Sequence, residues 1–292
     1  MDKIHFLWLQ KISSINKKLN LEKYINEIYK YNEDIIEAFN NTKSILKDSN
    51  LDLSIVECLL DKNIIENTKF EYNNIIKSGY KIVTIEDREY PRKMLENKKG
   101  PFCYIASCNI DLNNKNVCIY YNDYFSKYAK NLVSYFGKIA CEENANVLTQ
   151  YKNSKIECLN ILSYEDMKSN IILPENKYIF LPFFNIEEFE LYLIDILVIV
   201  EARYEEKIIK LVDEMAKSAK EVLVVPSTVF NKNSYFSNYL IKQGADVLLN
   251  KWDLKFVLKR LISWQFFLFV IYFKLWKEEK KYERKGPRKA RK

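Results

Sequence analysis

The chain has 292 residues, 48% apolar and 29% charged, which is long enough for two domains with a sizeable core. Only 5 glycines and a single histidine, His5, argue against a glycine-lined phosphate loop and against histidine-based metal sites or catalytic triads. The net charge of +7 lies in the tail, because Lys274–Lys292 contain ten Lys or Arg and three Glu. The remainder is neutral, with 36 of the 46 basic and 36 of the 39 acidic residues, so any nucleic-acid-binding patch must be local.

Residues 1–79 are expected to form an N-terminal helical domain. Apolar residues recur there at helical spacing, for example through Phe6, Leu9 and Ile12. Ser78-Gly79 then ends the last of these helices. The pattern is typical of a small helical bundle.

From residue 80 the pattern changes to short β-branched strands that alternate with helices. Strands are predicted over residues 81–85, 102–105, 117–121, 146–149, 156–162 and 178–181, with helices over 124–136 and 186–193. Residues 196–202 and 221–226 are two further apolar strands joined by a charged helix over 204–217, which is the form of a parallel βαβ unit. Pro226 ends the second strand because proline has no N–H to donate to a ladder. We therefore predict an α/β fold, a Rossmann-like, mostly parallel sheet, as a domain over residues 80–255.

Residues 256–292 are predicted to hold a C-terminal apolar, aromatic helix and a basic tail. Residues 261–273 carry no charge, but a spanning helix needs about 20 apolar residues. Three interpretations stay open: a helix docked on the chain's own core or on a partner, an interfacial anchor, and a tilted membrane span. The tail over 277–292 is either a solvated end or a contact for anionic lipid or nucleic-acid phosphates.

The cysteines point to a reducing compartment. The six show no CxxC pair, and most lie in apolar runs, which is typical of reduced, buried thiols. The first ten residues are too short an apolar run for a secretory leader. We expect a cytoplasmic protein.

Several motifs occur together in one order. A strand ending in Glu201-Ala202 is followed by Val225-Pro226, then Phe230-Asn231 with Ser234, then Asn238 with Leu240-Ile-Lys-Gln-Gly-Ala245. Upstream lie Asp87-x-x-Tyr90-Pro91 with Leu95, and the helix segment Phe6-Leu-Trp-Leu9. In this order and spacing, over roughly residues 4–250, the chain resembles the DprA/Smf family of DNA-processing proteins.

The loops that carry that family's chemistry differ in this chain. Tyr121-Asn-Asp123 stands where the family has Gly-Ser-Arg, and Thr149–Ser154 matches a second loop without its glycines or arginine. Ile186-Glu-Glu188 replaces an Arg-Asn-Arg segment, and Arg203–Lys207 replaces a Gly/Ser/Thr run. Each lost phosphate contact weakens polynucleotide binding, so the resemblance implies the fold more firmly than the activity.

The resemblance implies single-stranded DNA binding, the loading of a RecA-type recombinase during DNA uptake and natural transformation, and homodimerisation. The alternative is a regulatory or interaction protein that kept the fold and lost DNA binding, with a membrane surface as a further partner through residues 261–292. Tyrosine-rich surfaces could stack bases even without the arginines. Candidate DNA contacts are Lys152, Lys155, Asn231, Ser234, Asn238 and Lys242.

Each candidate contact also has a purely structural interpretation. Asn231, Ser234 and Asn238 suit a turn and the cap of the following helix, and the lysines suit a solvated surface. The sequence shows no metal cluster, cofactor loop or nucleophile–base pair, so we expect no cofactor and no enzymatic activity. Glu201, at the end of its strand, has a favoured position for a site but is a single carboxylate.

Overall fold

The computed structural model describes residues 3–15, 61–97, 100–121, 126–148, 157–168, 176–231 and 235–261. Within these residues the chain forms one nine-stranded sheet in the order β1-β2-β6-β5-β4-β3-β7-β8-β9. The strands are β1 (Lys81–Thr84), β2 (Cys103–Ala106), β3 (Asn116–Tyr121), β4 (Asn146–Leu148), β5 (Leu159–Ser163), β6 (Lys177–Leu181), β7 (Ile196–Glu201), β8 (Glu221–Val224) and β9 (Asp246–Val247).

Helices α1 (Ile4–Ile15), α5 (Lys62–Lys77), α6 (Arg92–Asn97), α7 (Lys127–Glu142), α8 (Tyr164–Lys168), α9 (Ile186–Leu193), α10 (Glu206–Lys217) and α11 (Tyr235–Lys242) surround the sheet. Residues 251–261 are also helical. From β6 along the sheet to β9 all neighbouring strands are parallel, whereas β1 pairs with β2, and β2 with β6, antiparallel. The predicted Rossmann-like α/β class is therefore confirmed.

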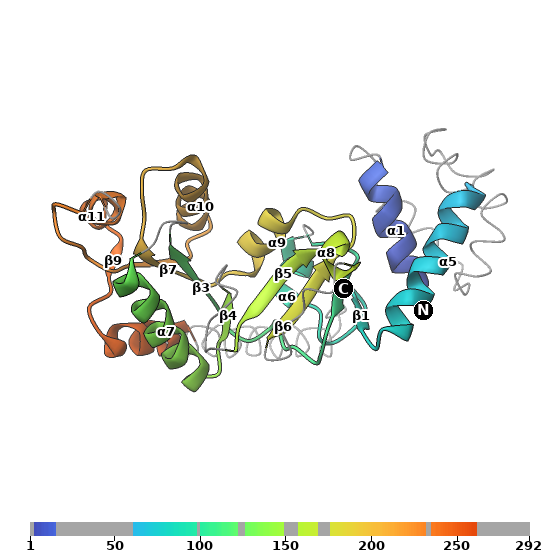
Figure 1. Ribbon diagram of the computed structural model, residues 1–292, viewed down its shortest axis with the longest axis horizontal. Helices are drawn as coiled ribbons and strands as arrows, with labels where there is room; N and C mark the ends of the chain where they lie inside the picture. The colour runs from blue at the N-terminus through green and yellow to red at the C-terminus, as the bar shows by residue number, and fades with distance from the viewer. Residues whose placement is uncertain are drawn as a thin grey trace, which may run out of the picture.

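The two faces of the sheet are covered by different helices (Figure 1). Side chains alternate along β7: Leu197 and Ile199 pack with Ile208 and Met215 of α10, on the face that α9 and α11 also cover. Val198 and Val200 face the other way, onto α7 and the helix over residues 251–261. All six residues of β7 are buried, as expected for a central strand covered on both faces.

The first helix docks directly on the antiparallel end of the sheet. The backbone N–H of Phe102, just before β2, donates to Gln10 Oε1 at 2.6 Å, and Lys3 pairs with Asp87 at 2.9 Å. Phe6 and Leu7 share an apolar cluster with Ile75 of α5 and with strand residues. The predicted helices that lie within residues 16–60 are outside the described part of the chain.

The C-terminal prediction is only partly covered. The helix over residues 251–261 inserts Leu254, Val257 and Leu258 into the core beside α7, so the sheet domain's packing continues beyond residue 255. The aromatic helix beyond Leu261 and the basic tail lie outside the described residues. Within the described residues, no helix is both long and apolar enough to cross a bilayer.

Candidate functional site

The order in which successive strands are added reverses between the parallel strands β3 and β7, and such a switch point is the usual ligand position of these folds. From β3 the chain proceeds to β4 on one side, and from β7 to β8 on the other. Tyr121 and Glu201 end the two strands as register partners, next to a bulge at Tyr120/Tyr121. Residues 122–125, which follow β3, lie outside the described part of the chain.

Glu201 fills the anion-binding position at this switch point. Its carboxylate is buried and accepts hydrogen bonds from Ser126 N at 3.0 Å and Ser126 Oγ at 2.8 Å. Ser126 is also the N-cap of α7, because its Oγ accepts from Ala129 N at 3.0 Å. A side chain of the protein therefore occupies the helix terminus where a phosphate would otherwise gain backbone N–H donors.

The next segment, between β8 and α11, is held by polar side chains of α11. Ser227 N donates to Asn238 Oδ1 at 3.0 Å, and Asn238 Nδ2 donates back to Ser227 O at 2.9 Å. Ser237 Oγ accepts from Ala202 N at 3.1 Å, and Phe236 N donates to Ala202 O at 3.2 Å. These bonds tie the start of α11 to the ends of β7 and β8.

Three exposed tyrosines lie at this end of the sheet: Tyr204 after β7, and Tyr235 and Tyr239 on α11. We call them the aromatic platform. Buried Phe236 supports it, with its ring centroid 5.3 Å from that of Tyr204 and 5.8 Å from that of Tyr239. Tyr204 is 72%, Tyr235 67% and Tyr239 43% exposed. On α11, Tyr235, Tyr239 and Lys242 are spaced i, i+4, i+7, so they line one outward stripe.

The predicted contact residues divide into three groups. Lys242 is exposed in the last turn of α11, beside the aromatic platform. Asn238 uses both ends of its amide within the protein, and Asn231 Nδ2 donates to Ser227 Oγ at 3.4 Å, so both hold the turn after β8, and their DNA contacts stay a prediction. Ser234, Lys152 and Lys155 lie outside the described residues.

The platform tyrosines were not among the predicted contact residues. Their signal was the i, i+4 spacing of Tyr235 and Tyr239 on a helix whose other side carries Phe236 and Leu240. Phe230, in the loop before α11, is 92% exposed and adds a further aromatic side chain to this end of the sheet.

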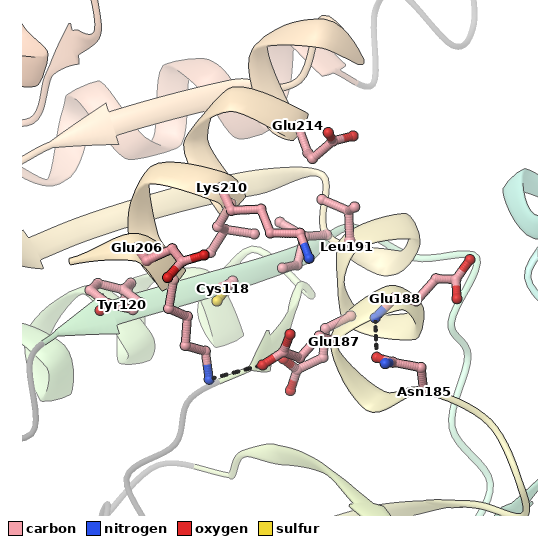
Figure 2. Close-up of a pocket in the computed structure, with 13 residues that line it drawn as sticks. Cys118, Tyr120, Asn185, Glu187, Glu188, Leu191, Glu206, Lys210 and Glu214 are labelled. Carbon is pink, nitrogen blue, oxygen red and sulfur yellow. Dashed lines mark hydrogen bonds and ion pairs between the residues drawn. The ribbon is translucent and has the colours of Figure 1, made fainter.

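A pocket of about 600 Å³ lies on the same face of the sheet, between α9 and α10, and we call it the α9–α10 pocket (Figure 2). Cys118 and Tyr120 of β3 form its floor together with Leu191, Ile194 and Leu211. Its polar lining comes from both helices: Asn185, Glu187, Glu188 and Glu190 on the α9 side, and Glu206, Lys207, Lys210 and Glu214 on the α10 side.

The pocket's charge is mainly acidic, and one of its carboxyl groups is partly withdrawn from water. Lys207 Nζ lies 3.9 Å from Glu187 Oε1 across the pocket, and burial raises the pKa of Glu190 to about 7 although Lys207 opposes the shift. Burial also raises the pKa of the Cys118 thiol, so this cysteine is a weak nucleophile. Among the described residues, no three His, Cys, Asp or Glu side chains are grouped to hold a metal ion.

Known proteins resemble this chain in structure but not detectably in sequence. No family model matches the chain, and no curated protein matches it by sequence. The structure is similar to the X-ray structure of DNA processing protein A (DprA) from Streptococcus pneumoniae, with a TM-score of 0.47, 13% identity and coverage of 79% of this chain and 95% of that one. It is also similar to DNA processing protein A from Helicobacter pylori, a structure described for its single-stranded DNA binding mode, with a TM-score of 0.48, 14% identity and coverage of 64% and 98%.

Proposed function

We propose that the protein binds single-stranded DNA on its aromatic platform, as a divergent DprA-like protein. The observation that carries this proposal is the outward stripe of Tyr235, Tyr239 and Lys242 on α11, extended by Tyr204. Tyrosine rings stack on bases of any sequence, and a lysine next to them attracts the phosphates between those bases.

The binding mode would differ from a phosphate-gripping loop. Glu201 already occupies the helix terminus at the switch point, so the phosphate backbone gains no donors there. Stacking on an aromatic ring contributes about 1–3 kcal/mol per base, so three exposed rings contribute about 3–9 kcal/mol, which spans millimolar to micromolar binding.

The finer parts of the proposal are loading of a RecA-type recombinase onto the bound strand during DNA uptake, action in the cytoplasm, homodimerisation, and a binding role without catalysis. Their support is the set of motifs in the order found in the DprA/Smf family. The structure gives those motif residues scaffold roles: buried Tyr90 donates to Pro101 O, and Gly244, with φ of 101°, ends α11.

The test is binding of a fluorescent oligo-dT to the full chain at low salt, followed by anisotropy. Replacing Tyr204 or Tyr239 by Ala should each weaken binding about tenfold, since each removes one stacked base. Tyr128→Ala is the matched control, because Tyr128 is 60% exposed but lies on α7, on the opposite face of the sheet.

Two results would contradict DNA binding at this surface. One is a dissociation constant for oligo-dT above about 100 μM, which is the weak end of ordinary non-specific affinity. The other is an equal loss of affinity for Tyr128→Ala and Tyr239→Ala.

The second candidate function is that of a regulatory or interaction protein that keeps the fold without binding DNA. The carboxylate of Glu201 at the anion position and the acidic α9–α10 pocket favour it. Retention of a recombinase by the purified protein in nuclease-treated extract, together with no oligo-dT binding, would select this function over the first.

A further inference from the structure

The α9–α10 pocket is a separate feature from the aromatic platform, and its shape and charge are those of a site for a small ligand. Its volume of about 600 Å³ lies within the range of roughly 300–1,000 Å³ that is usual for small-molecule sites. It has an apolar floor of β3, α9 and α10 side chains between two polar walls.

The walls determine the sign of the ligand's charge. Five glutamates and two lysines line the pocket, so its formal charge is −3 when all carboxyl groups are ionised. Phosphates and carboxylates are therefore repelled, and a cation is attracted.

The spacing of the carboxylates determines the form of the cation. Figure 2 shows Glu187 and Glu188 on α9, with Glu206 and Glu214 well separated along α10. They do not converge on one point, and in the described part of the chain no acidic group has the arrangement of a metal site. An elongated ligand with cationic groups at intervals matches this arrangement better than a compact ion.

Glu190 gives the site a carboxyl group that accepts no hydrogen bond among the described residues, although the charge of Lys207 acts on it. It belongs to the α9 wall, is partly buried, and no donor among the described residues hydrogen-bonds to its side chain. An ammonium group in the pocket would supply that donor, and its charge would restore the ionised carboxylate.

We propose that the α9–α10 pocket binds an aliphatic polyamine. The methylene segments would lie on the floor formed by Cys118, Leu191 and Leu211, and the ammonium groups would pair with Glu190 and with Glu206 on the opposite wall. This inference goes beyond the proposed DNA-binding function and does not depend on it.

The experiment is isothermal titration of the full chain with spermidine, without DNA, at pH 7.5 and low salt. Glu190→Gln and Glu206→Gln should each weaken binding about five- to tenfold, because each removes one ion pair in a partly buried site. Glu66→Gln is the matched control: Glu66 is exposed on α5, far from the pocket in sequence and structure, and should leave the affinity unchanged. Butane-1,4-diamine should bind more tightly than butylamine, since its second ammonium group can form a second ion pair.

Four results would overturn the proposal. They are no heat of binding up to about 1 mM spermidine, equal weakening by Glu66→Gln and Glu190→Gln, equal affinity for butylamine and the diamine, and displacement of spermidine by Mg²⁺ at equal concentration. Circular dichroism of each variant checks that it is folded. Oligo-dT binding is measured without polyamine, and spermidine binding is measured without DNA. A negative result in one titration therefore does not affect the result of the other.

Discussion

At the scale of single residues, Glu190 makes stability depend on pH. Burial raises its pKa from 4.5 to about 7 in the folded protein, so folding favours the protonated form. The stabilising contribution is complete below about pH 4.5 and is lost as pH rises through 7. Glu190→Gln should therefore raise the free energy of unfolding by about 2 kcal/mol at pH 8, after allowing for partial exposure, and by little at pH 4.5.

Urea unfolding of both proteins at pH 4.5, 6 and 8 checks this expectation. The difference between variant and parent should grow between pH 4.5 and 7 and stay constant above. A constant difference at every pH would mean that the carboxyl group titrates normally.

Other residue roles could be predicted from the sequence only as alternatives. Asn238 suited either a DNA contact or a turn, and the structure shows its part in the turn, since both ends of its amide bond to Ser227, while the DNA contact stays a prediction. Glu201 could be placed at the end of its strand, but not its bonds to Ser126, 75 positions away in the chain. Hydrogen-bond partners that are distant in the chain depend on the fold. The local sequence shows only which polar groups need a hydrogen-bond partner.

At the scale of elements, the N-terminus of α7 depends on one serine. Ser126 caps the helix and donates to buried Glu201, so Ser126→Ala removes the cap and one of the carboxylate's two Ser126 donors. We expect a loss of about 2–3 kcal/mol in the free energy of unfolding.

Ser163→Ala is the comparison for that prediction. Ser163 Oγ accepts from Asp166 N at 3.2 Å and donates to its exposed carboxylate at the start of α8, without a buried acid. It should cost less than about 1 kcal/mol. Denaturant unfolding of both variants tests this, and equal costs would show that the bond to Glu201 contributes nothing.

The elements that sequence predicted well are those with strong periodicity. β7, α10 and β8 lie within residues 196–224 as expected, because long β-branched runs and an amphipathic helix leave few alternatives. The two-residue strand β9 and the five-residue helix α8 were missed, because segments so short show no hydrophobic periodicity. The α9–α10 pocket was also missed, although its acidic lining was visible at residues 186–188, because it forms only where two separate helices, which begin at Ile186 and Glu206, approach each other.

At the scale of the whole molecule, the distribution of charge predicts how DNA binding responds to salt. Residues 1–273 carry equal numbers of basic and acidic side chains, and Lys242 is an exposed cation beside the aromatic platform. Each phosphate neutralised on a single strand contributes about −0.7 to the slope of log K against log salt. Binding through stacking with one to three phosphate contacts therefore predicts a slope of about −1 to −2.

If the ten Lys and Arg of residues 274–292 carry the binding instead, the predicted slope of log K against log salt is about −5 or steeper. Oligo-dT titrations between 50 and 300 mM salt separate the two cases. Replacing the ten basic residues of 274–292 by Gln should leave a shallow slope unchanged. Tyr239→Ala should lower the affinity without altering the slope. A steep slope that the tail substitutions abolish would move the DNA contact from α11 to the C-terminus, and the aromatic platform would then need another partner.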